Sequence, residues 1–455
     1  MRHALSQRQL INNMGRKPKD LIFKKVKHHK LKRIIQAPKG MPDILPEDDP
    51  FRRKISKVAH DIADYYGFGK VELPIAEETN LFLHGTGQTS EIVQRQMFNF
   101  KTPGGDQLSL RPEFTPNLMR VYLERGFFNL PKPVKLFTYG PLFRYEQPQR
   151  GRYRQFWQYD FEIIGDGDPI YDALTIQLMY NSLVDLKIKN LLVEVNTIGC
   201  DNCRPIWRKN LKNYFHSKLK KLCPDCQRRY KTNILRILDC KNEQCQPIKE
   251  NAPKMIDYLC HDCRGHFKSL LEYLEELQLP YEINHRLVRG LDYYTKTVFE
   301  IRETDDNLAL CGGGRYDYLV EILGGKNTPA VGAAAGIERL VEILKNKQPK
   351  ISDANQKNRL FLIILGDQAK KKGLNLLESL RKANINAAES FGKDSLKAQL
   401  KQADKMNIPF VLIMGQKEAI DNTVIFRDMK SGVQEVISVD NISEELKKHI
   451  KNFII

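Results

Sequence analysis

The sequence predicts an α+β domain that carries a cysteine-rich insertion and is followed by a smaller α/β domain. With 455 residues, the chain is longer than one hydrophobic core comfortably supports. Residues 135–143 and 155–162 are aromatic and partly alternating, as strands of a pleated sheet are. Residues 199 to about 278 contain eight of the nine cysteines. Beyond residue 357, apolar runs alternate with helical stretches in a βαβ rhythm.

The first 39 residues form a basic arm with twelve Lys or Arg residues and one acid, Asp20. The arm supplies more than half of the net charge of +18 and has little apolar periodicity, so we expect it to be disordered when free. It could attract nucleic-acid phosphates. It could also be a targeting peptide, or lie upstream of a start at Met14 or Met41. We favour a basic extension of a cytoplasmic protein, because the arm lacks the serine enrichment and the apolar core of targeting peptides. No apolar run in the sequence approaches the length of a membrane span.

The segment from residue 40 to about 125 predicts two strands and two helices. A helix is expected over residues 48–66, because apolar residues recur there at helical spacing, namely Phe51, Ile55, Val58 and Ile62. A strand over residues 68–74 would end at a proline, and another strand is expected over residues 107–112. A helix then begins at about Thr115.

The two aromatic strands flank a loop that is rich in arginine. The loop and its edges hold four arginines within eleven residues, namely Arg144, Arg150, Arg152 and Arg154. Guanidinium groups held above a sheet suit the recognition of a polyphosphate, because each can bind two oxygens at once. Taken alone, the hairpin could equally be a solvated basic surface or touch nucleic acid non-specifically.

The cysteine-rich insertion follows a helix over residues 172–184 and a strand over residues 191–195. Its pairs Cys200/Cys203 and Cys223/Cys226 are nineteen residues apart, which is typical of a zinc ribbon. The pairs Cys240/Cys245 and Cys260/Cys263 could then close a second four-thiolate Zn²⁺ site. Disulfides are the weaker interpretation, because nothing indicates a secreted protein. A helix containing Phe267 is expected to lead back to the first domain.

A polar segment over residues 345–357 predicts a linker. Beyond it, the last domain (357–455) has apolar runs that predict strands, namely Leu360–Leu365, Ile385–Ala388, Phe410–Met414 and Thr423–Phe426.

Three further peptides, together with the arginine-rich hairpin, resemble the histidyl-tRNA synthetase family of class II aminoacyl-tRNA synthetases. They are Leu287–Thr295 (LVRGLDYYT), Cys311–Asp317 (CGGGRYD) and Val331–Leu340 (VGAAAGIERL). The resemblance implies a catalytic domain over residues 40–350 with an antiparallel sheet covered by helices, a C-terminal anticodon-binding domain, and a homodimer. It also implies three substrates: L-histidine, ATP with Mg²⁺, and tRNA(His).

The resemblance further implies which residues bind ATP. Arg144 would bind the α-phosphate, Arg339 the terminal phosphate, and Arg289 would act as the catalytic arginine at the α-phosphate. Arg289 has a simpler structural interpretation as an ion-pair partner of Asp292. No Walker A sequence is present, so a P-loop site is not expected.

The histidine site is implied in the same way. Glu162 and Tyr294 would hold the imidazole ring with Tyr293 beside them, and the α-ammonium group would be held by Glu113, Thr115 and Gln158. Two other functions remain open. One is a non-catalytic paralogue such as the regulatory subunit of ATP phosphoribosyltransferase, and the other is a zinc-ribbon protein that binds nucleic acid. The retained Arg144, Arg289 and Arg339 favour the ligase.

Overall fold

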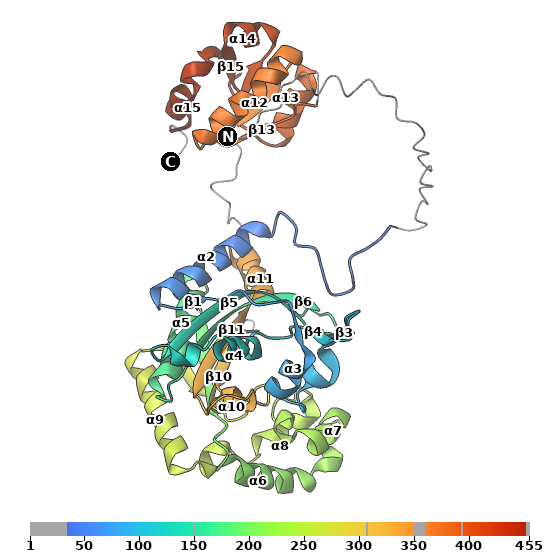
Figure 1. Cartoon of the computed structure of the whole chain (residues 1–455), viewed down its shortest axis with the longest axis vertical. Coiled ribbons are helices and arrows are strands. Elements are labelled where there is room, and N and C mark those ends of the chain that lie inside the picture. Colours follow the sequence, from blue (N-terminus) through green and yellow to red (C-terminus); the bar gives the residue numbers. More distant parts are fainter. Residues whose placement is uncertain (1–33, 150, 306–307, 349–359, 393–394, 452–455) are drawn as a thin grey trace, which may run out of the picture.

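The computed structural model describes residues 34–149, 151–305, 308–348, 360–392 and 395–451 (Figure 1). The predicted arm up to residue 33, Arg150 of the hairpin and residues 349–357 of the predicted linker lie outside the described residues. Within the described part of the chain, no helix is both long enough and apolar enough to cross a membrane.

The first domain is built on a mixed sheet. Within the described residues the strand order is β1-β5-β6-β11-β10-β9-β7-β8, in which every pair is antiparallel except the two edge pairs β1–β5 and β7–β8. The strands are β1 (Gly69–Lys70), β5 (Val134–Phe143), β6 (Gln155–Ile164), β7 (Leu191–Thr197), β8 (Tyr281–Ile283), β9 (Thr295–Glu303), β10 (Leu308–Arg315) and β11 (Ala330–Gly336). The predicted hairpin over 135–143 and 155–162 is confirmed as β5–β6, with Phe143 opposite Gln155.

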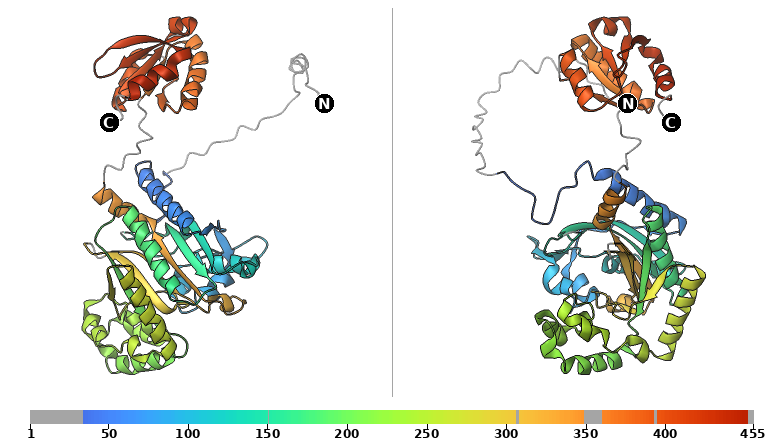
Figure 2. Two further views of the ribbon diagram at one scale, coloured as in Figure 1. Left: turned by 90° about the vertical axis from the view of Figure 1, so that its left-hand side faces the viewer. Right: turned by 180° about the vertical axis from the view of Figure 1, so that it is seen from behind.

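Four helices bury apolar side chains against one face of this sheet (Figure 2). They are α2 (Asp49–Tyr65), α5 (Ile170–Asp185), α9 (His261–Glu276) and α11 (Ile337–Lys347). In α2, Phe51, Ile55, Ala59 and Ile62 are buried at a spacing of three or four residues, which places them on one side of the helix. The helices predicted at 48–66, at 172–184 and around Phe267 are therefore confirmed.

The strand predicted over residues 68–74 was wrong in length. Only Gly69 and Lys70 pair with β5. Val71 N still donates to Phe137 O of β5 at 2.8 Å, but beyond it the chain leaves the sheet. There, Leu73 O and Pro74 O accept hydrogen bonds from Arg111 Nη1, at 2.6 Å and 3.1 Å, in place of strand partners.

A smaller subdomain lies on the other side of the sheet. Its strands pair in the order β2-β4-β3, all antiparallel. Its elements are β2 (Ala76–Glu78), α3 (Thr79–Gly85), η1 (Ile92–Gln96), β3 (Phe98–Lys101), β4 (Gln107–Leu110), α4 (Thr115–Glu124), η2 (Phe127–Asn129) and, later in the chain, α10 (Leu319–Ile322). The strand predicted at 107–112 and the helix predicted from Thr115 are confirmed as β4 and α4. Thr115 therefore sits at the beginning of a helix, next to Glu113.

The cysteine-rich insertion runs between β7 and β8 and contains short helices in its described residues (Figure 1, lower part). They are α6 (Arg204–His216), η3 (Leu219–Lys221), α7 (Pro224–Thr232), η4 (Ile234–Ile237), η5 (Glu243–Cys245), α8 (Gln246–Glu250), η6 (Met255–Tyr258) and then α9. Buried residues of the insertion, such as Trp207 and Ile237, belong to the same apolar cluster as Leu118 of α4 and Tyr294.

The predicted pairing of the cysteines was wrong. The first pair does not meet the second. Instead it meets the fourth, and the second meets the third. We name these groups the outer cluster (Cys200, Cys203, Cys260 and Cys263) and the inner cluster (Cys223, Cys226, Cys240 and Cys245). The reason is topological: α6 carries the chain away from the sheet and α9 brings it back, so the two ends of the insertion meet.

The C-terminal domain has a sheet in the order β13-β12-β14-β15-β16, which is parallel in its first three strands and antiparallel in the last two pairs. Its elements are β12 (Leu360–Ile364), α12 (Asp367–Lys382), β13 (Ala387–Glu389), α13 (Leu396–Lys405), β14 (Phe410–Met414), α14 (Gln416–Asp421), β15 (Thr423–Asp428), β16 (Gln434–Ser438), η7 (Val439–Asn441) and α15 (Ile442–Lys451). The four predicted strands are confirmed within a few residues, but β16 was not predicted. The predicted linker began too early, because α11 continues to Lys347.

Candidate active site

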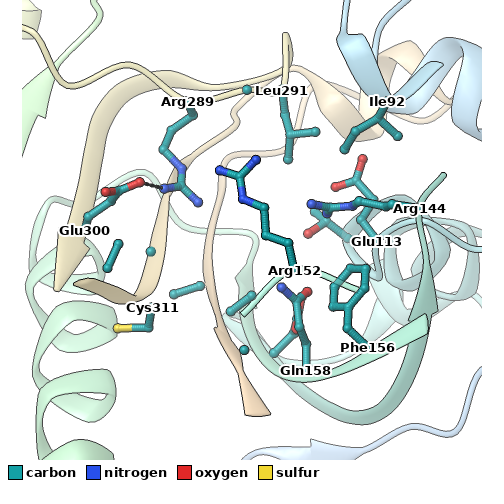
Figure 3. A pocket seen from close by; sticks show the side chains of 18 of the residues that line it. Ile92, Glu113, Arg144, Arg152, Phe156, Gln158, Arg289, Leu291, Glu300 and Cys311 are labelled. Carbon is teal, nitrogen blue, oxygen red and sulfur yellow. Dashed lines mark hydrogen bonds and ion pairs between the residues drawn. The ribbon is translucent and has the colours of Figure 1, made fainter. Parts of the chain in front are cut away.

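A cavity of about 330 Å³ opens between the large sheet and the smaller subdomain (Figure 3). Its lining includes eight of the nine predicted histidine- and ATP-site residues, namely Glu113, Thr115, Arg144, Gln158, Arg289, Tyr293, Tyr294 and Arg339. These residues come from positions scattered over more than two hundred residues of sequence. The fold brings them to one place.

The floor of the cavity follows from the period of two in a strand. Side chains alternate between the faces of a sheet, so Gln158, Asp160 and Glu162 of β6 share one face. The intervening Tyr159, Phe161 and Ile163 are buried against the helices on the other face. Strand β6 therefore presents a row of three polar side chains towards the cavity side.

Three glycines of the neighbouring strands β10 and β11 leave room for side chains of the site. A Cβ on Gly312 would lie 2.6 Å from Arg289 Nη1, and a Cβ on Gly314 would lie 2.9 Å from the Tyr294 ring. A Cβ on Gly332 would overlap the Glu162 carboxylate. Each glycine thus leaves the space that a site residue fills, which explains why this face of β10 and β11 is built from such small residues.

Arg289 is held at one end of the cavity by an ion pair with Glu300 of β9. Burial, the largest single effect, disfavours the charged guanidinium, but the interactions with Glu300, Tyr294 and Tyr293 together outweigh it and raise the pKa of Arg289. Its Nε has no hydrogen-bond partner among the described residues. The alternative ion pair with Asp292 was wrong, because Asp292 instead accepts hydrogen bonds from Thr89 and from Asn233 Nδ2.

Two further predicted arginines are fixed from the hairpin and from α11. Arg144 Nε donates to Pro112 O at 2.8 Å, and its guanidinium lies 5.2 Å from the centre of the Phe156 ring. Arg339 Nη1 donates to Ala309 O at 2.6 Å, which anchors it at the edge of β10. Burial and the nearby charge of Arg152 lower the pKa of Arg339. An anion between these guanidinium groups would relieve this like-charge repulsion.

Arg152 and Arg154 of the same hairpin differ in position. Arg152 lines the cavity, and Figure 3 shows its guanidinium facing the same space as that of Arg289. Arg154 stacks on Tyr145 at 3.7 Å instead and does not line the cavity. Sequence reasoning named the loop arginines together and could not separate these two.

The other end of the cavity is acidic and aromatic. Glu113 accepts hydrogen bonds from Thr86 and from Tyr293 OH, the latter at 2.7 Å. Burial raises the pKa of Glu113, although these hydrogen bonds oppose the shift. The rings of Tyr293 and Tyr294 are 4.7 Å apart between centres. This end therefore offers carboxylate and hydroxyl groups next to an aromatic wall.

Glu162 lies beneath this end and, unlike the other predicted residues, does not line the cavity. Its carboxylate accepts a hydrogen bond from Thr115 Oγ1 at 2.6 Å and another from Tyr316 OH. Burial raises the pKa of Glu162 to about 7, although both hydrogen bonds oppose the shift. A ligand at this end would therefore meet Thr115 and the tyrosines directly, with Glu162 one step behind.

Two residues of the site were missed. Tyr316 lies in the CGGGRYD peptide and was given no role, yet it bonds Glu162 and packs 5.5 Å from the Tyr293 ring. Asp160 lines the cavity, and burial, followed by the charges of Glu162 and Glu113, raises its pKa well above the ordinary value. The alternation of β6 was the signal that could have found Asp160, because it shares a face with Gln158 and Glu162.

The cavity thus has Arg289, Arg152 and Arg339 towards one end and buried carboxyl groups with tyrosines at the other, and Arg144 lies beside Glu113 of that second end (Figure 3). Such an arrangement fits a phosphate ester at the first end and a cationic amine with a hydrogen-bonding ring at the second. Among the described residues that line the cavity, no side chain is poised as a covalent nucleophile: Cys311 is buried, and burial raises the pKa of its thiol. The chemistry that fits is therefore positioning and charge stabilisation rather than covalent catalysis.

Comparisons with known proteins agree with this geometry. The family model described as "Histidyl-tRNA synthetase" matches residues 40–202 and 206–340, and the model "Anticodon binding domain" matches residues 359–449. A histidine–tRNA ligase of Symbiobacterium thermophilum is 42% identical over 428 residues, covering 91% of this chain and 99% of that protein.

Solved structures give the same result. The apo histidyl-tRNA synthetase of S. aureus superposes with a TM-score of 0.73 at 32% identity, covering 91% of this chain and all of that one. A protein of Bacillus halodurans described as an ATP phosphoribosyltransferase regulatory subunit/histidyl-tRNA synthetase superposes with a TM-score of 0.60, covering 84% of this chain and 99% of that one. At 21% identity, this second likeness shows the fold alone.

Proposed function

The chain belongs to the histidyl-tRNA synthetase family, and we propose from this premise that it is a histidine–tRNA ligase. It would activate L-histidine with ATP and then transfer the histidyl group to the 3′-terminal ribose of tRNA(His). The observation that carries the proposal is that one cavity joins an arginine end to a carboxyl–tyrosine end, with Arg144 beside Glu113 where the two meet (Figure 3). Its class II architecture, an antiparallel-rich sheet with helices and an anticodon-binding domain, agrees with this function.

In the first step, the carboxylate of histidine attacks the α-phosphate of ATP and pyrophosphate leaves. Negative charge grows on the phosphoryl oxygens, so groups that hold positive charge there accelerate the step. We assign this role to Arg289 and Arg144, and the binding of the terminal phosphate to Arg339. The support is that all three line the cavity, and that protein groups hold Arg289 through Glu300 and Arg144 through Pro112 O.

ATP would enter with Mg²⁺, which neutralises part of the phosphate charge when it is bound. Oxygen donors that suit this ion are present at the arginine end, since Glu146 and Glu300 line the cavity there. Structural Zn²⁺ is a separate matter, because the cysteine clusters lie in the insertion.

Histidine would be selected at the other end. We propose that Glu113, Thr115 and Gln158 bind its α-ammonium group, and that Tyr294 fixes the imidazole ring with Tyr293 alongside. Glu162, which does not line the cavity, would act on the ring through Thr115 and Tyr316. The network of Thr115, Tyr316 and Glu162 holds these groups in place before substrate arrives. An amino acid without ring nitrogens would leave buried polar groups unpaired, which costs binding energy and gives specificity.

A non-catalytic regulatory paralogue is the competing function. Two observations favour the ligase over it. Nearly the whole chain aligns at 42% identity with a protein named histidine–tRNA ligase. A domain that matches the anticodon-binding family follows the catalytic domain, as a protein that handles tRNA requires. We also propose a cytoplasmic location and a homodimer; both rest on the family.

The test is ATP–pyrophosphate exchange with each of the twenty amino acids supplied separately. We expect exchange with histidine and none above background with the others. Absence of exchange with histidine, from folded protein that still binds it, would overturn the proposal in favour of the regulatory paralogue.

A further inference from the structure

The eight cysteines of the insertion form two compact groups of four sulfur atoms each. Within each cluster, all four Sγ atoms lie within 4.8 Å of one another. In the outer cluster the measured Sγ–Sγ distances are 3.4 Å for Cys200–Cys203, 3.7 Å for Cys203–Cys263 and 3.9 Å for Cys200–Cys260. In the inner cluster Cys223 and Cys240 are 3.8 Å apart. Seven of the eight thiols are buried, so these are interior groups rather than surface thiols.

These distances match one tetrahedral metal ion in each cluster. A Zn–S bond of about 2.3 Å in tetrahedral geometry sets neighbouring sulfurs about 3.8 Å apart. A disulfide would bring its two sulfurs to about 2.05 Å, well below the 3.4 Å between Cys200 and Cys203, and all eight cysteines are free. An iron–sulfur cubane would spread the four sulfurs further, because each binds a different iron atom.

Backbone groups around the sulfurs support a thiolate state. Cys200 N donates to Cys203 Sγ at 3.3 Å, Cys223 N donates to Cys245 Sγ at 3.3 Å, and Asn242 N donates to Cys240 Sγ at 3.4 Å. Amide groups directed at sulfur in this way favour its negative form and orient it for a metal.

A buried lysine gives an independent sign of negative charge. Lys249 of α8 is only 7% exposed, and its ammonium group donates to the carbonyl oxygen of Cys240 in the inner cluster. A lysine is rarely buried unless a negative group faces it. Four thiolates around one divalent cation carry a net charge of about −2, which would add to the negative charge of Asp239 near Lys249.

We propose that the insertion holds two structural zinc ions, one in the outer cluster and one in the inner cluster. The sites are nested in the sequence, because the inner-cluster cysteines all lie between the two halves of the outer cluster. The outer ion joins the beginning of α6 to the beginning of α9, where the insertion leaves and re-enters the domain. The inner ion joins the beginning of α7 to the η5–α8 corner within the insertion. Zn²⁺ is the commonest ion for a closed four-cysteine site of this geometry.

The two ions also stabilise one wall of the cavity through the residues they hold. Arg204, next to Cys203, donates to Tyr294 O at 2.6 Å. Between the inner-cluster cysteines 226 and 240, Asn233 Nδ2 donates to Asp292 Oδ1 at 3.0 Å and Arg236 pairs with Glu91. These hydrogen bonds from the insertion thus hold the peptide over residues 289–294 in place.

The first experiment measures metal by mass spectrometry in the full chain, purified under reducing conditions without added metal. We expect two zinc per chain. The double variant Cys223→Ser/Cys226→Ser should hold one zinc, and so should Cys200→Ser/Cys203→Ser. The matched control is His261→Ala, because His261 lies between Cys260 and Cys263 but is fully exposed, so this variant should keep both. Folded, reduced wild-type chain without zinc, or with iron in its place, would overturn the proposal.

The second experiment tests the nesting by thiol alkylation of Cys223→Ser/Cys226→Ser. If the sites are nested, the remaining zinc protects the outer cluster and leaves Cys240 and Cys245 reactive. Protection of Cys240 and Cys245 together with Cys260 and Cys263 would instead show pairing of neighbours along the sequence and overturn the nested arrangement. Amide hydrogen exchange of residues 289–294 should also rise in this variant, and unchanged exchange would overturn the support of the cavity wall.

Discussion

Gly332 of β11 lies directly opposite Glu162 of β6, and a Cβ atom on Gly332 would overlap the Glu162 carboxylate. The buried network of Glu162, Thr115 and Tyr316 therefore depends on a hydrogen atom at position 332. The small residues of β11 are thus a requirement of the side chains on the neighbouring strand.

Gly332→Ala should consequently damage the histidine end of the cavity. The new methyl group must displace Glu162, which we expect to cost about 1–3 kcal/mol of unfolding free energy and to raise the KM for histidine. Denaturant unfolding and histidine-dependent exchange measure the two effects. Gly265→Ala in α9 is the control, because a Cβ there meets nothing within 4 Å. Equal behaviour of the two variants would refute the contact.

Arg289→Ala tests the arginine end. The change removes an oriented charge from the α-phosphate site, so we expect adenylate formation to fall by about 10²–10³-fold with the fold intact. Single-turnover formation of histidyl-adenylate measures this, with circular dichroism as a check of folding. The control is Arg208→Ala, an exposed arginine on α6. A near-normal rate in Arg289→Ala would remove its catalytic role.

Glu162 should make stability depend on pH in a defined direction. Burial raises the pKa of Glu162 from its ordinary 4.5 to about 7. Between these values the folded chain keeps a proton that the unfolded chain has lost, so stability falls as pH rises through this window and is flat above it. The difference in unfolding free energy between the wild type and Glu162→Gln should therefore drop by about 3 kcal/mol from about pH 4.5 to about pH 7. A constant difference would contradict the raised pKa.

The Asp172–Arg315 ion pair should matter for stability rather than chemistry. Both side chains are fully buried, and Arg315 also bonds Asp317 and the Asp166 and Asp168 carbonyl groups. Asp172→Ala leaves this charge without its main partner, which should cost about 3–5 kcal/mol.

Thermal unfolding measures the loss. Asp61→Ala is the control, because it removes an exposed ion pair with Lys57 that contributes about 1 kcal/mol or less. Similar losses in both variants would contradict a buried pair.

Local patterns were sufficient to predict much of the fold. The aromatic alternation at 135–143 and 155–162 predicted β5 and β6, and helical spacing predicted α2, because in these segments the sequence period matches the buried face. Strand β16 was not predicted, because three of its five residues are exposed and its sequence shows little apolar alternation. A segment was therefore predicted when its buried residues recur with the period of a strand or helix, and was missed when few of its residues are buried.

Contacts between distant segments were harder to predict. Arg289 was given Asp292 as its structural alternative because the two are close in sequence, but strand β9 brings Glu300 to it instead. The cysteine pairs were assigned to their nearest neighbours for the same reason, whereas the path of α6 and α9 nests them. Tyr316 was given no role from the sequence, because its hydrogen bond to Glu162 depends on β10, which it follows directly, lying near β6.

The most direct test of the central claim is charging of a tRNA(His) transcript with labelled histidine by the full chain. The account predicts ATP-dependent histidine at the 3′ end of this tRNA and none when an unrelated tRNA or another amino acid is supplied. Folded protein that binds histidine and ATP, yet leaves tRNA(His) uncharged, would contradict it.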